Sequence, residues 1–392
     1  MEETKKPENR HVTKVLIACA IFLLLGLGWF VYYWEWGRFF ENTTDAYVNG
    51  NKISLNAQTT GNITGIYTDE ADFVTQGQLL ITLDETDARL KVELKKDHLA
   101  NALRDVVSLF ANAKETKSQI TGKEADLVVA KREYERRTTL VSDGGVSLED
   151  LQTAEAKFTS IFEEHQALQY KYAGLLAEIK QTTIEDHPRV RQAKDELREA
   201  WVALKRCQIK SPASGLIAQR KAQVGMRVKP ETPLLSVIPI NEMWVDANFK
   251  EVQLKKMRIG QKVRMKSDMY GSDLIFEGTL IGINGGTGSV FSVLPPQNAT
   301  GNWIKIVQRL PVRISFEPKQ LKDFPLMLGL SMDVRVDLRD ERGAQIPAPT
   351  KEGILYRTIA FENQEEGVEE VIEKIVKENV FPSDVSLESQ NE

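Results

Sequence analysis

An uncharged stretch near the N-terminus is the first strong feature of the hydrophobic pattern. Residues 15–34 contain no charged side chain and are mostly aliphatic or aromatic. At about 1.5 Å per residue, a helix of this length extends roughly 30 Å, the thickness of one hydrocarbon core. Its end is rich in aromatic residues, which gather at membrane interfaces, whereas a signal peptide would end in small residues. The pattern predicts one transmembrane anchor over residues 15–36.

The charges around this stretch predict its orientation. Four basic residues precede it, whereas Arg38 alone follows it closely. Because positive charge favours the cytoplasmic side, we expect residues 1–14 to form a cytoplasmic tail and the rest of the chain to lie outside. A buried core helix is the alternative, but it is disfavoured by so long an uncharged run at the N-terminus.

A long helical region is predicted over residues 87–206. The region is rich in strong helix formers and has no proline before Pro188. Apolar positions recur with coiled-coil spacing, every seventh residue in the first half and alternately every third and fourth in the second. These positions are Val106, Ala113, Ile120, Leu127, Tyr134 and Val141, then Leu151, Ala154, Phe158, Ile161, His165, Leu168, Tyr172, Leu175 and Ile179.

A coiled-coil seam has two positions in each seven-residue repeat, and in the first half the second of these positions changes from apolar to polar along the chain. These companion positions are Leu103, Phe110, Lys117, Glu124 and Lys131. We therefore expect weaker contacts between the helices toward the far end of this region.

A tight reversal separates the two halves at residues 141–148. Two glycines, Gly144 and Gly145, stand at its centre, and Ser147 is placed to cap the helix that follows. We expect an antiparallel hairpin with arms of about 55 residues, roughly 80 Å long, and a kink in the returning arm at His187–Pro188. A compact helical bundle is the alternative, but no third or fourth helix is predicted to complete it.

Two short segments that flank the helical region resemble one another without a gap. Matched positions lie 154 residues apart, and both segments have the composition of short strands with glycine turns. The pairs are Gly61 and Gly215, Ile63 and Ile217, Val74 and Val228, and Leu80 and Leu234. Residues 43–86, which comprise the first half-motif and a strand that precedes it, and residues 207–240 are predicted to pair into one β-sandwich, because each half-motif is too small to bury a core alone. The alternative is that the match between the two segments is a coincidence.

The chain after the second segment is strand-like. Alternation of apolar and charged residues over 332–339 predicts a half-buried strand, and we expect residues 241–340 to form a small antiparallel β-barrel. Residues 341–392 are acidic and predicted to be partly disordered, with one amphipathic helix near 368–380. The predicted fold is an elongated α+β chain of anchor, split β-sandwich with inserted hairpin, and barrel.

Composition excludes several functional classes. The 392 residues are 42% hydrophobic and 27% charged, so one membrane span fits and a polytopic transporter does not. The net charge of −5 provides no basic surface for nucleic acid. The two cysteines, Cys19 and Cys207, cannot form a disulfide framework.

No arrangement of residues predicts catalysis, a cofactor or a metal ion. The four histidines are scattered and have no metal-ligand spacing. The Gly-rich residues 284–289 lack the lysine of a phosphate-binding loop. The two matched segments resemble biotinyl and lipoyl carrier domains, but Asp84-Glu85-Thr86-Asp87 occupies the hairpin where a carrier presents its lysine. We therefore expect a protein that is not an enzyme.

Three runs of sequence carry a resemblance to a known family. They are Thr43-Thr44-Asp45-Ala46-Tyr47-Val48, residues 243–251, and residues 286–314. With the predicted architecture they resemble the EmrA-type membrane fusion proteins of the HlyD-like periplasmic adaptor family, over residues 10–340. The resemblance implies a homo-oligomeric adaptor at the bacterial inner membrane, with its bulk in the periplasm. It would link a major-facilitator-type exporter to a TolC-like outer-membrane channel for multidrug efflux.

The resemblance implies one candidate site, and the composition of a Gly-rich loop suggests a second. Related adaptors contact the channel through an Arg, a Leu and a Ser, which here match Arg136, Leu140 and Ser147 around Gly144 and Gly145. Ser147 could instead act only as a helix cap. A second site, facing the exporter or hydrophobic drugs, is a Gly-rich loop whose exposed apolar residues suggest contact, although it could equally just close the barrel. Its candidate residues are Gly288, Val290, Phe291, Val293, Asn298 and Trp303.

Two other functions remain open at this point. An adaptor for protein or polysaccharide secretion would have the same architecture. A membrane-tethered coiled-coil scaffold with no transport role would also contain the anchor and the hairpin.

Overall fold

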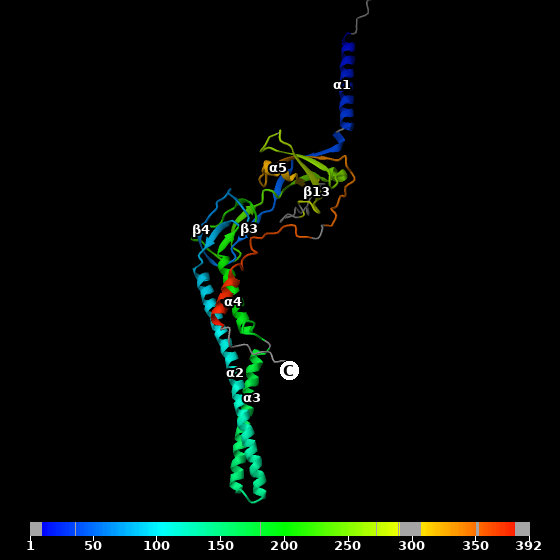
Figure 1. Ribbon diagram of the computed structural model, residues 1–392. Helices are drawn as coiled ribbons and strands as arrows, with labels where there is room; N and C mark the ends of the chain where they lie inside the picture. The colour runs from blue at the N-terminus through cyan, green and yellow to red at the C-terminus, as the bar shows by residue number, and fades with distance from the viewer. Residues whose placement is uncertain are drawn as a thin grey trace, which may run out of the picture.

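The computed structural model describes residues 10–35, 37–180, 182–271, 273–288, 290, 307–349 and 353–380. The molecule is elongated (Figure 1). The N-terminal helix, a β-barrel, a β-sandwich and a long helical hairpin follow one another from one end to the other, so the anchor and the hairpin tip lie at opposite ends. The predicted fold class is confirmed.

The N-terminal helix α1 (Arg10–Glu35) is long and apolar enough to cross a membrane. The side chains of its apolar span are exposed rather than buried within the protein. The short helix η1 (Gly37–Phe39) follows after a single residue. The guanidinium of Arg38 lies 4.7 Å from the Trp34 ring centre and 4.8 Å from that of Phe39, which places a cation among the aromatic residues expected at the membrane surface.

A seven-stranded antiparallel sheet forms the barrel. A bridge between Tyr47 and Ser331 joins its two edge regions. Alternating apolar residues build its core, as in β15, where Met332, Val334 and Val336 are buried. In sheet order its strands are β1 (Phe40–Thr43), β15 (Met332–Asp337), β12 (Lys262–Ser267), β13 (Phe276–Ile283), β14 (Arg309–Phe316), β11 (Met243–Lys250) and β2 (Ala46–Gly50).

The barrel begins earlier in the chain than the sequence analysis predicts. Residues 43–50 were assigned there to the first half of the sandwich, but β1 pairs with β15 and β2 pairs with β11. The physical reason is that Ala46 and Val48 point into the barrel core. Two further elements complete this domain, the 3-10 helix η2 (Glu251–Lys256) and helix α5 (Pro318–Asp323).

The β-sandwich is stitched from two distant parts of the chain. One sheet has the order β3-β10-β8-β5 and the other β7-β6-β4-β9, so each sheet contains two strands from each half of the sandwich. The strands are β3 (Ile53–Asn56), β4 (Gly61–Ile66), β5 (Phe73–Val74), β6 (Leu79–Leu83), β7 (Gln208–Lys210), β8 (Gly215–Ala218), β9 (Arg227–Val228) and β10 (Pro233–Ile238).

The matched positions of the internal repeat form the centre of this sandwich. All six of its aliphatic members belong to one buried cluster: Ile63, Val74, Leu80, Ile217, Val228 and Leu234. At Gly215 a Cβ atom would lie 2.3 Å from the Ile238 carbonyl oxygen, so close strand packing requires glycine there. The predicted pairing of the two segments is therefore confirmed.

The inserted hairpin consists of α2 (Thr86–Ser142), α3 (Leu148–Ile179) and α4 (Pro188–Lys205). The outgoing arm is one helix of 57 residues. The returning arm is broken between Ile179 and Pro188, whereas the sequence analysis predicts a single kinked helix. Pro188 lacks an amide hydrogen and forces the preceding His187 into an extended conformation, so His187 caps α4 and does not continue α3.

The seam between the arms differs from the predicted one by one residue on α2. Lys117, Glu124 and Lys131 are exposed. The companion seam positions are instead Thr116, Lys123, Ala130 and Arg137, three of them polar. They are buried or half-buried and alternate with the predicted apolar series. The predicted seam positions of α3 are all buried or half-buried.

A third helix covers the base of the hairpin, contrary to expectation. Helix α6 (Val368–Asn379), coloured red in Figure 1, packs against α2 and α4. Its buried residues Val368, Ile372 and Val376 join the cluster that includes Leu99 and Leu103 of α2. We call α4, α6 and the stretch of α2 over residues 92–113 the hairpin root, and the remainder of α2 with α3 the distal half. The tail is thus partly an ordered element, while residues 381–392 lie outside the described residues.

Polar contacts hold the tail along the molecule as it approaches α6. The Thr358 hydroxyl donates to the Pro212 carbonyl oxygen at 2.6 Å, on the sandwich. The indole N–H of Trp201 donates to the Glu366 carbonyl oxygen at 3.2 Å, and Arg198 pairs with Glu369 at 2.7 Å. This ion pair lowers the pKa of Glu369.

Candidate functional sites

The turn at the hairpin tip joins α2 and α3 through residues 143–147. Gly144 has a φ of +72°, a left-handed conformation that favours glycine. The amide of Gly145 donates to the Leu140 carbonyl oxygen at 3.0 Å, which closes the end of α2. The two glycines predicted for the tip therefore have a structural role in reversing the chain.

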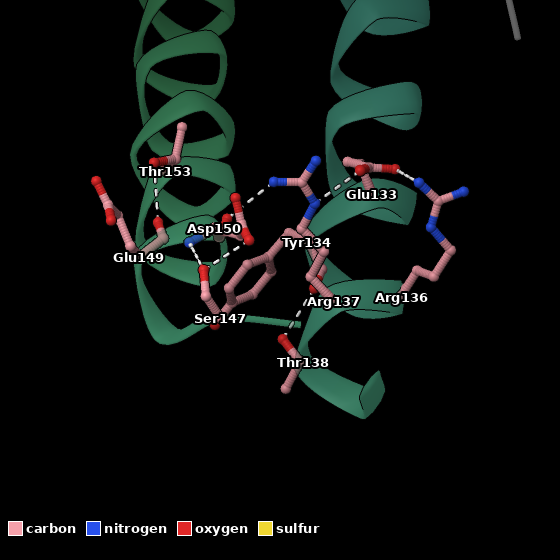
Figure 2. A network of polar contacts seen from close by, with 9 residues as sticks. All are labelled: Glu133, Tyr134, Arg136, Arg137, Thr138, Ser147, Glu149, Asp150 and Thr153. Carbon is pink, nitrogen blue, oxygen red and sulfur yellow. Dashed lines mark hydrogen bonds and ion pairs between the residues drawn. The ribbon is translucent and has the colours of Figure 1, made fainter. Parts of the chain in front are cut away.

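Ser147 is the N-cap of α3, as the sequence predicts. Its hydroxyl oxygen accepts a hydrogen bond from the Asp150 amide at 3.1 Å, and its hydroxyl lies 2.6 Å from the Asp150 carboxylate (Figure 2). This hydrogen bond lowers the pKa of the Asp150 carboxyl. The Ser147 side chain is therefore engaged within its own helix, although it remains exposed.

Arg136 and Leu140 are both accessible at the tip. Arg136 lies on the side of α2 that faces away from α3 and pairs with Glu133 (Figure 2). Its side chain is 67% exposed, and Leu140 is 39% exposed one turn further on. With Ser147 they form a tip that presents a cation, an aliphatic side chain and a capping hydroxyl.

Arg137 ties the two arms together, and the sequence analysis did not identify it. Its guanidinium bonds Glu133 at 2.8 Å within α2 and donates to the Asp150 carbonyl oxygen of α3 at 2.9 Å. Figure 2 shows it directed across the gap between the helices. The signal that could have found it is the seven-residue series through Thr116, which places Arg137 in the seam.

A second polar tie lies further along the same series. Lys123 of α2 pairs with Glu164 of α3 at 2.7 Å. The hydrogen bond lowers the pKa of Glu164 and raises the pKa of Lys123. The distal half is therefore joined by polar contacts at seam positions where a coiled coil usually has apolar residues.

The Gly-rich loop leaves the barrel between β13 and β14. Of its predicted residues, Gly288 and Val290 are described, and Val290 is 67% exposed. Phe291, Val293, Asn298 and Trp303 lie outside the described residues. The loop starts beside a hollow of about 660 Å³ on the outer face of the barrel, lined by parts of β2, β11, β13 and β14.

The sequence runs that carry the family resemblance converge on this outer face. Asn248 donates to the Asp45 carboxylate at 3.0 Å, and Arg309 pairs with the same carboxylate. Two residues earlier on β11, Asp246 accepts from Asn49 at 2.8 Å and from the Trp244 indole at 3.0 Å. The Arg313 guanidinium lies over the Trp244 ring at 4.2 Å.

These contacts bring together in space three runs of polar residues that are far apart in the sequence. Both carboxylates have a cation and an amide as partners, since Arg313 lies 3.6 Å from Asp246, so the network links strands β2, β11 and β14. The hollow is consequently polar and neutral along this wall.

Within the described ranges, no group of three or more His, Cys, Asp or Glu side chains is placed to hold a metal ion. Cys207 is buried, and burial raises the pKa of its thiol, which disfavours the reactive thiolate.

Comparison with known proteins gives a consistent result. The family model for the EmrA alpha-helical hairpin domain matches residues 86–207. The chain is 41% identical over 355 residues to the multidrug export protein EmrA of Escherichia coli strain K12, covering 91% of this chain and 90% of that protein. It is 37% identical over 378 residues to the multidrug export protein EmrA of Haemophilus influenzae, covering 96% and 97%. The solved structure of the periplasmic adaptor protein EmrA aligns with 76% of this chain and 99% of that one, at 18% identity and a TM-score of 0.39.

Proposed function

Because the chain belongs to the EmrA family of periplasmic adaptors in multidrug efflux, we propose that it links a major-facilitator-type exporter to a TolC-like outer-membrane channel. The observation that supports this function is the separation between the membrane anchor and the hairpin tip. The membrane anchor and the hairpin tip lie at opposite ends of an elongated molecule (Figure 1). Helix α2 alone, with 57 residues, extends roughly 85 Å at about 1.5 Å per residue.

In this proposal the anchor lies in the bacterial inner membrane with residues 1–14 in the cytoplasm, because basic residues precede the span. The barrel then lies beside the exporter and the hairpin projects across the periplasm. Several copies would be needed to surround a channel mouth, so a homo-oligomer is part of the proposal.

Arg136 and Leu140 are the proposed channel contacts at the tip. Both side chains are accessible, and an exposed guanidinium can bond backbone oxygens of a partner while Leu140 fills an apolar groove. Ser147 is a weaker test residue, because replacing it would remove the helix cap together with any contact.

Cross-linking in intact cells tests the bridge. A Leu140→Cys variant, treated with a reagent that carries a maleimide for its thiol and an active ester for nearby lysine amines, should form an adduct with an outer-membrane channel protein. The matched control is Tyr170→Cys, which is exposed but lies along the shaft of α3. Absence of a channel adduct at position 140, or equal adducts at both positions, would contradict tip docking.

A pair of arginine variants tests the contact itself. Arg136→Ala should raise drug sensitivity, because it removes the cation at the tip. Arg132→Ala removes an exposed arginine one turn earlier on α2 and should leave efflux unchanged. If both variants behave alike, Arg136 has no specific docking role.

The Gly-rich loop is the proposed contact with the exporter or with hydrophobic drugs. The proposal rests on exposed Val290, on the adjoining hollow, and on the apolar residues Phe291 and Val293 in the sequence. Phe291→Ser should impair transport without altering membrane insertion or expression. Normal transport by this variant would rule out the loop contact.

A further inference from the structure

An exposed apolar patch lies on the barrel, away from the hairpin. It consists of Met269 and Ile275, from the loop between β12 and β13, and of Phe324 and Met327, from the segment after α5. Their exposed fractions are 53%, 40%, 40% and 40%. We call these four residues the loop patch.

The loop patch is held in shape by contacts beneath it. The Tyr270 hydroxyl donates to the Pro325 carbonyl oxygen at 2.6 Å, which joins its two segments. The Tyr270 ring packs edge-on against Phe324, with ring centres 5.8 Å apart. The side-chain amide of Gln320 donates to the Ile275 carbonyl oxygen at 3.2 Å. The apolar side chains are therefore displayed by an ordered support.

The position of the loop patch relates it to the membrane anchor. The β12–β13 loop and α5 lie on the side of the barrel from which α1 leaves, and the loop rises toward the level at which α1 ends (Figure 1). Glu35 ends α1, and Phe40 already begins the first barrel strand. Even at full extension this connection spans roughly 17 Å, so the barrel is confined close to the bilayer surface.

The charges around the loop patch favour contact with lipid without a requirement for anionic headgroups. Residues 266–275 and 318–327, which contain the loop patch, carry three lysines and three aspartates and therefore have no net charge. They are Lys266, Lys319 and Lys322, and Asp268, Asp273 and Asp323. Binding to the bilayer would therefore be driven by burial of apolar side chains and not by attraction of a basic surface to anionic lipids.

We propose that the loop patch rests in the interfacial layer of the bilayer that holds α1, as a second membrane contact of the chain. The contact would be weak in isolation. Tethering by α1 supplies an effective concentration on the order of millimolar, so weak insertion is sufficient. The contact would fix the tilt of the barrel, and through it the direction of the hairpin. This inference rests on the membrane anchoring of the family, but not on the identity of exporter or channel.

Fluorescence quenching in proteoliposomes tests the proposal with the full chain. Met269→Cys, in a Cys19→Ala background, is labelled with an environment-sensitive fluorophore; the remaining Cys207 is buried. Vesicles are made of phosphatidylcholine or of its brominated form. We expect a blue-shifted emission and strong quenching by brominated lipid at position 269, with little change when phosphatidylglycerol is included.

Two further labels make the outcome decisive. A label on native Cys19, which is exposed on α1, reports whether the anchor is inserted. A label at Val224→Cys, an exposed position on the sandwich, should remain unquenched. Quenching at 19 and 269 but not at 224 supports the proposal.

Quenching at Cys19 with none at 269 overturns the loop-patch contact and leaves the anchor intact. If position 269 then becomes shielded only when an exporter is added, the loop patch is a protein-docking surface and the lipid proposal is wrong. Loss of quenching at Cys19 as well would instead overturn the anchoring on which both proposals depend.

Discussion

The root and the distal half of the hairpin are built from the same long helix but are stabilised differently. In the root, α2 packs against α4 and α6 around a shared apolar cluster in which Leu99, Leu103 and Leu197 are fully buried. In the distal half, two helices meet along a seam that contains Lys123 and Arg137. Large apolar burial is thus confined to the end nearest the sandwich.

This difference has a physical consequence for how the hairpin can behave. Each buried aliphatic side chain contributes about 1.5–3 kcal/mol, whereas exposed ion pairs contribute roughly 0–1 kcal/mol. The root should therefore be rigid, while the tip can separate or adjust at small cost. A projecting arm with a firm base and an adaptable end suits contact with a partner at its far end.

The largest expected effect comes from the root core. Leu103→Ala should lower the free energy of unfolding of the helical region by about 2–5 kcal/mol, because it leaves a cavity among α2, α4 and α6. Leu94→Ala changes the same residue type on the same helix, where the side chain is 64% exposed, and should cost far less. Thermal denaturation followed by circular dichroism compares the two; equal losses would mean that the root is not a packed core.

The second expected effect tests the third helix. Ile372→Ala should weaken docking of α6 by about 2–4 kcal/mol, since this side chain is buried against α2 and α4. Amide hydrogen exchange over residues 368–379 should accelerate, together with exchange in the facing stretch of α2. Ile354→Ala alters an exposed isoleucine of the tail and serves as the control. Unchanged exchange in the Ile372 variant would show that α6 contributes nothing to the root.

A smaller effect is expected at the tip. Arg137→Ala should cost about 1 kcal/mol locally, because it removes the hydrogen bond to α3 and the pairing with Glu133. Arg136→Ala removes an arginine that pairs with Glu133 of the same helix, on the side away from α3, and should leave the tip closed. Electron–electron distance measurements between spin labels on α2 and α3 distinguish them; a tip that stays closed without Arg137 would contradict its bridging role.

The smallest expected effect is a pH dependence confined to the distal half. Hydrogen bonding to Lys123 holds the pKa of Glu164 below its ordinary value of 4.5. The stability that this pair contributes to the folded distal half is therefore complete at pH values above 4.5. It is lost as the pH falls through the lowered pKa of Glu164. Hydrogen exchange near residues 117–127 should accelerate on acidification while the root stays protected.

The root provides an internal control for this pH dependence. It contains a comparable pair, Lys95 with Glu196 at 2.7 Å, whose hydrogen bond lowers the pKa of Glu196. Because apolar packing holds the root, protonation of Glu196 should not open it. Glu164→Gln should abolish the acid sensitivity of the distal half; a variant that retains it would locate the titrating group elsewhere.

Much of the fold was predictable from local periodicity. The uncharged N-terminal run, the alternation in β15 and the seven-residue repeats of the hairpin each correspond to an element in the structure. The paired positions of the sandwich were also predictable, because the repeat reflects equivalent core sites. Of the tip, the turn glycines and the Ser147 cap were identified, since turns and caps depend on residues adjacent in sequence.

Local pattern led to wrong predictions where several arrangements of the chain satisfy it. Lys117 and Thr116 both stand near apolar positions in a heptad series, and only the facing helix selects Thr116 for the seam. Residues 43–50 can pair as strands in either β domain, and the partner β11 decides for the barrel.

By itself, the sequence determined which segments of this protein are helix, strand, turn and membrane anchor, because hydrophobic period, proline and capping residues act over a few residues. Tertiary structure alone decided that α6 returns to cover the hairpin root, that Arg137 bridges the arms, and that the loop patch lies on the side of the anchor. Those outcomes depend on which apolar surfaces meet across hundreds of residues, and the burial that selects among them exists only once the chain has folded.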